Sequence, residues 1–166
     1  MRILGIDPGY DRLGLAVVEG DASAPSVIWS ACALPPKGER EKRLAAVFDE
    51  VAAAIKKHGP DRLAIETLFF NANVTTGIGV AEARGAVLAA AGRAELPVME
   101  YSPQQVKIAV TGHGAASKDA VARMVPRLAP LSPRKRLDDE LDAIAVAICS
   151  LADRYPHPAA KRIAKK

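Results

Sequence analysis

Acidic residues stand where apolar segments of this chain begin or end. One apolar run stops at Asp7, with a Pro-Gly pair directly after it, and a second short run stops at Glu66. Asp139 and Asp142 open a segment rich in alanine and isoleucine. Carboxylates gathered together repel one another unless cations lie between them, and Mg²⁺ is a hard cation that takes oxygen ligands and keeps positions open for phosphate. Two such ions can activate water and stabilise a leaving oxygen, which is the chemistry of phosphodiester hydrolysis.

Each acid also has an ordinary explanation when it is taken alone. An Asp-Pro-Gly sequence is typical of a turn in which the aspartate accepts hydrogen bonds from nearby amides, and this interpretation of Asp7 stays open. Acids in the first turn of a helix are favoured by the helix dipole, which accounts for Asp138 and Glu140. It accounts poorly for Asp142, which starts the buried alanine-rich stripe. Whether Asp138 or Asp139 belongs with Asp142 is also open.

The strands that position these acids are predicted from apolar runs and turn residues. The run before Asp7 connects to the next run by so short a turn that the two must form an antiparallel hairpin. The run that ends at Glu66 follows a segment of helical period, so we expect it to lie parallel to the first strand and beside it. Asp7 and Glu66 would then point into one crevice, where open α/β sheets bind ligands. The predicted strands cover residues 2–7, 13–18, 27–34, 62–66 and 97–101.

Helices are predicted between and after these strands. Residues 39–58 and 74–92 have helical patterns, and Gly77, Gly79 and Gly85 in the second predict close packing, against either the core or a helix of a second subunit. Ser102-Pro103 begins a short helix that contains Lys107, and Ser117 is the predicted N-cap of a helix that carries Lys118. A last helix starts at residue 138. The order predicts an α/β fold with a five-stranded mixed sheet flanked by helices on both faces.

Composition limits the classes of protein to which the chain can belong. Its 166 residues, 49% of them hydrophobic, suit one domain, which we place at residues 1–154, followed by a basic and flexible tail at 155–166. No apolar run approaches the roughly 18 residues of a membrane span, so we expect a cytoplasmic protein without membrane association. Cys32 and Cys149 lack the spacing of a zinc site and are expected to be reduced core thiols. The net charge of +4 and the pI near 9.2 favour a polyanionic partner.

Several motifs together resemble the RuvC family of Holliday junction resolvases, within the RNase H-like nuclease superfamily. The resemblance covers roughly residues 2–152. It rests on the order and spacing of five segments: Gly5-Ile6-Asp7-Pro8-Gly9, Ile65-Glu66-Thr67-Leu68-Phe69-Phe70-Asn71, Gln105-Val106-Lys107, Gly112-His113-Gly114-Ala115-Ala116-Ser117-Lys118 and Asp139-Glu140-Leu141-Asp142-Ala143.

The resemblance implies a role for each matched position. The catalytic metal ligands of the family fall on Asp7, Glu66, Asp139 and Asp142. They imply two Mg²⁺ ions per active site, with Mn²⁺ as a substitute. Lys107 and Lys118 are implied to contact phosphates, and Phe69 to stack on a base near the crossover, which would make all three DNA-binding residues.

The resemblance also implies a substrate and partners. A homodimer would make paired symmetric nicks in strands of like polarity of four-way junction DNA, leaving 5′-phosphate and 3′-hydroxyl ends in a short thymine-containing sequence. RuvA and RuvB, the branch-migration proteins, are the implied partners.

Three other hypotheses fit part of the pattern. A YqgF/RuvX-like nuclease would act on RNA precursors, and Asp11-Arg12-Leu13-Gly14 is faintly similar to its opening. A sugar kinase or actin-like ATPase shares the opening strands, but the chain is too short for two domains. A junction-binding module that does not cut would gain nothing from carboxylates that face phosphates. A distant Asp142, or lysine and arginine filling the acidic gathering, would argue against a nuclease.

Overall fold

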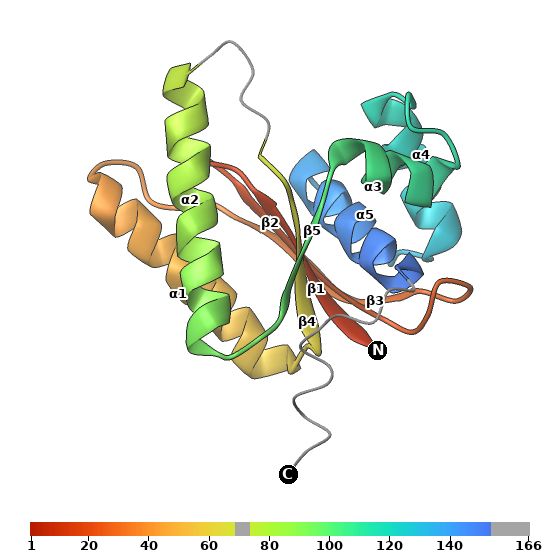
Figure 1. Ribbon diagram of the computed structural model, residues 1–166, viewed down its shortest axis with the longest axis horizontal. Coiled ribbons are helices and arrows are strands. Elements are labelled where there is room, and N and C mark those ends of the chain that lie inside the picture. The colour runs from red at the N-terminus through yellow and green to blue at the C-terminus, as the bar shows by residue number, and fades with distance from the viewer. Residues whose placement is uncertain (69–73, 154–166) are drawn as a thin grey trace.

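The computed structural model describes residues 1–68 and 74–153, and within them a single mixed sheet forms the centre of the molecule (Figure 1). Its strand order is β3-β2-β1-β4-β5. The first three strands form an antiparallel meander, while β4 pairs in parallel with β1 and β5 in parallel with β4. The predicted mixed sheet is therefore confirmed. The strands are β1 (Arg2–Pro8), β2 (Leu13–Glu19), β3 (Ser26–Ala33), β4 (Arg62–Glu66) and β5 (Val98–Tyr101).

Helices cover both faces of the sheet, as predicted (Figure 1). On one face, α1 (Arg40–His58) and α2 (Val74–Arg93) bury apolar residues against alternate strand positions such as Leu4 and Leu15. On the other face, α5 (Asp138–Ala152) packs over positions such as Ile3 and Ala16. Two short helices, α3 (Pro103–Thr111) and α4 (Lys118–Leu128), pack against α5. The alternation of side chains along each strand thus divides the core into two layers.

The close approach of α5 to the sheet decides where its acids lie. A Cβ atom on Gly5 of β1 would come within 2.1 Å of the Ala143 carbonyl oxygen, and one on Gly14 of β2 within 2.0 Å of the Asp139 carbonyl oxygen. Only glycine leaves room for this backbone contact. Because α5 rests directly on β1 and β2, its first turns are held at the strand end that carries Asp7.

The helix ends follow the predicted signals. Ser102 accepts a hydrogen bond from the Gln105 amide, and the Gln105 side chain accepts one from the Ser102 amide, which forms a capping box at α3. Ser117 caps α4 in the same sense by accepting from the Ala120 amide. Gly59, with φ of 54°, ends α1 in the left-handed conformation. The two serine caps fix the starting points of the helices that carry Lys107 and Lys118.

The predicted close packing of α2 against its own chain is confirmed at Gly79 but not found at Gly85, where a contact with a second subunit stays a prediction. A Cβ atom on Gly79 would lie 2.7 Å from the Tyr10 ring, so α2 lies directly against the β1–β2 turn. A Cβ atom on Gly85 would have nothing within 4 Å, so the missing side chain there serves no contact within the described residues.

No helix in residues 1–68 and 74–153 is both long enough and apolar enough to cross a lipid bilayer. Within the same ranges Cys32 and Cys149 carry free thiols, and Cys149 is buried.

Candidate active site

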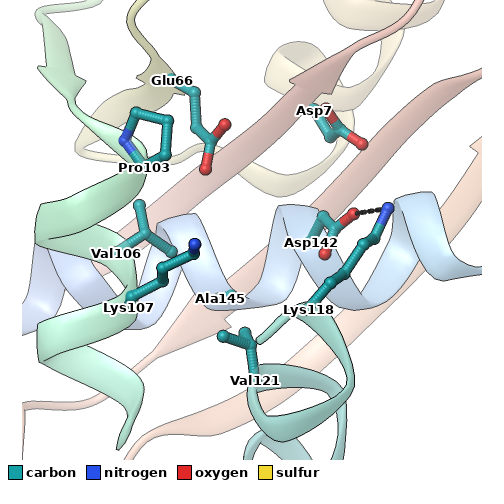
Figure 2. Close-up of a pocket in the computed structure, with 9 residues that line it drawn as sticks. All are labelled: Asp7, Glu66, Pro103, Val106, Lys107, Lys118, Val121, Asp142 and Ala145. Carbon is teal, nitrogen blue, oxygen red and sulfur yellow. Dashed lines mark ion pairs between the residues drawn. The ribbon is translucent and has the colours of Figure 1, made fainter. Parts of the chain in front are cut away.

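A cavity of about 300 Å³ opens at the carboxyl ends of β1 and β4 (Figure 2). Asp7 and Glu66 reach it from these two strands, Asp142 from α5, Lys107 from α3 and Lys118 from α4. The crevice predicted between the two strand ends is therefore present. Three of the four predicted acids and both predicted lysines line the same cavity.

Asp7 carries negative charge that its surroundings do not neutralise. Burial raises the pKa of Asp7 to about 7, helped by repulsion from Asp142, Glu66 and Asp139, while Lys118 acts weakly in the opposite direction. The pKa of Glu66 is also raised, first by burial and then by Asp142. In the described part of the chain, no lysine, arginine or histidine lies within 4.0 Å of either carboxylate. Perturbed acids in a cleft mark a functional site more often than a structural one.

Asp142 has a counterion instead. The Lys118 ammonium lies 2.8 Å from the Asp142 carboxylate (Figure 2). It also lies 3.4 Å from the Asp138 carboxylate. The hydrogen bond to Asp142 raises the pKa of Lys118 to about 12. The expectation that no base fills the acidic gathering is thus wrong at Asp142 and correct at Asp7 and Glu66.

Asp139 and Asp138 face different surroundings, although they are adjacent in the chain. Asp139 is 14% exposed and pairs with Arg12 at 3.1 Å, whereas Asp138 is 51% exposed. Burial raises the pKa of Asp139, and its charge in turn raises that of Asp7. The backbone of Asp139 also lies against Gly14, which pairs with Asp7 across the hairpin. The backbone of Asp139 is therefore held close to Asp7 and its charge acts on Asp7, although Asp139 does not line the cavity.

The acids suit a divalent cation because of their donor atoms, although their side chains do not form a complete set of ligands around one point. Every candidate ligand is a carboxylate oxygen, which is the donor that Mg²⁺ prefers. Burial and, after it, repulsion from neighbouring acids raise the pKa of Asp7, and a bound cation would favour its ionised form. As they stand, no three His, Cys, Asp or Glu side chains of the described residues lie close enough together to form a metal cluster. A bound ion would have to draw the carboxylates together.

Of the remaining predicted site residues, the structure describes Lys107 but not Phe69. Lys107 lines the cavity, and among described residues it forms no ion pair within 4.0 Å, so no acid holds its ammonium group there. Its charge also lowers the pKa of Glu66, although burial outweighs this effect. Phe69 lies outside the described residues, so its role as a stacking residue stays a prediction.

Sequence reasoning missed two arginines beside the site. Arg12 bridges the β1–β2 turn to Asp138 and Asp139. Arg43, whose side chain is 7% exposed, donates hydrogen bonds to the Tyr10 carbonyl and to Asp11, and its guanidinium lies 4.3 Å from the Tyr10 ring centroid. The short hairpin could have placed Arg12 near Asp7. Nothing in the helical pattern of α1 singled out Arg43.

The chain that builds this site matches one family over nearly all its length. The family model described as crossover junction endodeoxyribonuclease RuvC matches residues 3–150. The chain belongs to the RuvC family. It is accordingly a nuclease, an enzyme of the hydrolase class, as the resemblance in the motifs implied.

Individual relatives agree with this assignment. The chain is 41% identical over 162 residues to crossover junction endodeoxyribonuclease RuvC of Thermotoga petrophila, covering 95% of this chain and 98% of that one. It is 43% identical over 150 residues to the RuvC of Moorella thermoacetica, covering 90% of each.

Solved structures agree on the fold. A structure described as Thermus thermophilus RuvC in complex with Holliday junction substrate superposes with a TM-score of 0.83 at 34% identity, covering 90% of this chain and 92% of that one. The yeast mitochondrial resolvase Ydc2 superposes with a TM-score of 0.65 at 11% identity, covering 90% of this chain and 78% of that one, a likeness of fold alone. The fold is the RNase H-like fold of these proteins.

Proposed function

We propose that the protein resolves Holliday junctions by divalent-metal-dependent hydrolysis, with paired symmetric nicks in strands of like polarity that leave 5′-phosphate and 3′-hydroxyl ends. One observation carries the proposal: the uncompensated carboxylates of Asp7 and Glu66 share a cavity with Lys107 and Lys118. Acids able to hold cations and bases able to hold a phosphate therefore face each other. Membership of a family of crossover junction endonucleases supports the same reaction.

We assign the metal ligands to Asp7, Glu66, Asp139 and Asp142. Two Mg²⁺ ions, or Mn²⁺ in their place, would supply an activated water and stabilise the leaving oxygen. The lysines hold the substrate, because ammonium groups bind phosphate oxygens as point charges. Lys107 already lines the cavity, and Lys118 exchanges the Asp142 carboxylate for a phosphate oxygen. Arg12 positions Asp139 beside Asp7 through their ion pair.

The rest of the proposal concerns DNA and assembly. Phe69 stacks on a base near the crossover, and residues 155–166 form a basic tail after a nuclease domain of residues 1–154. A homodimer supplies one active site for each of the two symmetric nicks, since a two-fold assembly matches a two-fold substrate. RuvA and RuvB are the proposed partners, and the cytoplasm, where bacterial DNA lies, is the proposed location. The positive net charge of the chain supports a nucleic-acid substrate.

The test is cleavage of a synthetic four-way junction with Mg²⁺ and with EDTA, beside a linear duplex and an RNA hairpin of matched length. We expect symmetric nicks in the junction with Mg²⁺ only. Preferential cleavage of the RNA would favour the YqgF/RuvX-like alternative, and a mobility shift without nicks would favour a binding module. Ligation of the products without a kinase step would verify the 5′-phosphate ends.

A further inference from the structure

A second cavity of about 250 Å³ lies against the first, and the two share Asp7, Glu66 and Pro103 in their walls. Its remaining lining comes from Pro8, Thr67, Leu68 and Val80. It therefore opens on the α2 side of the acidic pair, whereas the first cavity opens on the side of α3, α4 and α5. The proposed reaction uses only the first cavity.

The two cavities differ in charge. Lys107 and Lys118 line the first, but no lysine, arginine or histidine of the described residues lines the second. The second cavity has the same two carboxylates, but no basic side chain of the described residues lines it to hold a phosphate. Its other groups are apolar apart from the Thr67 hydroxyl. A neutral ring with polar atoms on its edge fits this lining, and that description matches a nucleobase.

Contacts within the fold hold the walls of the second cavity in place. The Thr67 amide donates to the Tyr101 carbonyl at 2.9 Å, which extends the β4–β5 pairing by one residue beyond Glu66. On the opposite wall, Val80 follows Gly79, whose close contact with the Tyr10 ring sets the position of α2. Pro8 is itself paired in the β1–β2 hairpin. These contacts hold β1, β4 and α2 around the cavity, and Thr67 and Leu68 line it directly after the end of β4.

We propose that the second cavity receives an unstacked nucleobase adjacent to the phosphate that is cut. This inference rests on the proposed function, since it places the phosphate at the acids of the first cavity. Within a nucleotide, base and phosphate lie on opposite sides of the sugar, and here two cavities of suitable chemistry lie on opposite sides of one acidic wall. The volume is below the roughly 300–1,000 Å³ typical of drug-sized ligands, which suits a single ring system.

The cavity would select a base by the hydrogen-bonding groups on the edge of the base and by the fit of its ring. The Thr67 hydroxyl donates a hydrogen bond to the Tyr101 carbonyl at 3.5 Å, which leaves its oxygen to accept from a donor on the edge of a base. Thr67 can therefore distinguish bases by the group they present. Leu68, Val80 and Pro8 contact the ring, as apolar groups do for bases taken out of the stack. The cavity therefore contributes to the choice of cleavage sequence, because a base that fits poorly leaves the adjacent phosphate badly placed.

The proposal is tested with Val80→Phe, which fills the cavity, and Val80→Ala, which enlarges it. Ala89→Phe is the matched control, because it adds the same ring to an exposed position of the same helix. Cleavage is mapped on four-way junctions with randomised nucleotides around the crossover. We expect Val80→Phe to lower cleavage at the preferred sequence at least about fivefold and to flatten the preference, with Ala89→Phe like the wild type. Val80→Ala and Thr67→Val should redistribute the preference among bases with less loss of rate.

A second measurement needs no turnover. Junctions carrying 2-aminopurine on either side of the cleaved phosphate are bound in EDTA, and fluorescence reports unstacking. We expect an increase at one of these positions with the wild type and with Ala89→Phe, and no increase there with Val80→Phe. An unchanged cleavage map and unchanged fluorescence for Val80→Phe would overturn the base cavity while wild-type nicking still upheld the proposed function. Absence of nicking by the wild type would instead overturn the proposed function.

Discussion

Two carboxylates, Glu140 and Asp7, show how differently this fold treats buried charge. Glu140, in the first turn of α5, is 5% exposed and accepts hydrogen bonds from Arg134 at 2.6 Å and from Ser30 at 3.0 Å. Burial alone would raise its pKa, but these bonds outweigh burial and lower it. Asp7 is held beside other acids instead, and its pKa is raised to about 7.

The contrast distinguishes Glu140, which stabilises the fold, from Asp7 and Glu66, which are available to bind a ligand. Removing a charge from water is unfavourable unless a partner replaces the lost hydration. At Glu140 the chain supplies that partner, which ties the loop before α5 to β3. At Asp7 and Glu66 it does not, so the folded state carries unfavourable electrostatic energy where a cation can relieve it. Replacing each acid should therefore have opposite consequences for activity and stability.

The largest expected effect is on cleavage by Asp7→Asn. The substitution keeps the shape of the side chain but removes a proposed metal ligand, so we expect the rate of junction cleavage to fall by about 10³-fold or more, beyond the range for loss of one neutral stabilising group. Junction affinity in EDTA should stay within a few-fold, because binding comes from the basic surface. Glu66→Gln should behave alike. Parallel loss of affinity and cleavage would show that these acids are structural.

The opposite pattern is expected for Glu140→Gln. It leaves Arg134 and Arg136 without their common carboxylate, and we expect a loss of about 3 kcal/mol in the free energy of unfolding, the low end for a broken buried pair because Arg134 is 42% exposed. Urea denaturation in EDTA measures it. Asp138→Asn is the control, since its exposed pairs should contribute less than about 1 kcal/mol. If Glu140→Gln lowered the cleavage rate per folded molecule as far as Asp7→Asn does, the distinction between a structural and a catalytic acid would be wrong.

This comparison also shows what the sequence could predict. The meander, the parallel placement of β4 and the convergence of Asp7 and Glu66 follow from short connections and a crossover helix, which are local features of the chain. The helix dipole explains why an acid suits the position of Glu140 in the first turn of α5, but it does not explain the burial of that side chain. Its burial depends on a loop arginine and on a serine of β3, 110 residues away, and no periodic pattern encodes that meeting.

The residues of the acidic site could be predicted from the sequence, but the ion pairs that they form could not. Strand ends and helix starts placed three acids and two lysines around one cavity, and the motifs agreed. Side-chain directions decided the rest: Lys118 pairs with Asp142, and Arg12 pairs with Asp139, which does not line the cavity. The second cavity was missed because it depends on how closely α2 approaches the β1–β2 turn at Gly79 and Tyr10, and no local pattern of the sequence gives that distance.

The pH dependence of stability should differ in sign between the two regions. Asp7 has a pKa of about 7 in the folded protein against 3.8 as its ordinary value, so the folded state binds the extra proton between these pH values. Stability in EDTA should therefore fall as pH rises from about 4 to 7. The fall should be a few kcal/mol at most, because each tenfold difference in proton affinity between the folded and unfolded states corresponds to about 1.4 kcal/mol.

Asp7→Asn should reduce that fall and make the EDTA-treated protein more stable than the wild type at pH 8, with equal stability near pH 4; the raised pKa values of Glu66 and Asp139 should leave part of the fall in place. Glu140 acts in the other direction: its lowered pKa contributes stability above its ordinary value of 4.5 that is lost as pH falls through the lower value. Thermal unfolding of Asp7→Asn and Glu140→Gln across pH 3–9 measures the two slopes. Equal stability of Asp7→Asn and wild type at pH 8 would mean that Asp7 is compensated after all.

The smallest expected effect distinguishes the two lysines of the cavity. Lys107 lines the cavity without an ion pair among described residues, so Lys107→Met should lower the slope of log affinity against log salt by about 1. Lys118 is already paired with Asp142, so in EDTA Lys118→Met should change the slope less, while both variants slow cleavage with Mg²⁺. Lys56→Met, at the far end of α1, controls for net charge and should leave cleavage unchanged. A full unit of slope lost in Lys118→Met would show that its bond to Asp142 does not compete with DNA.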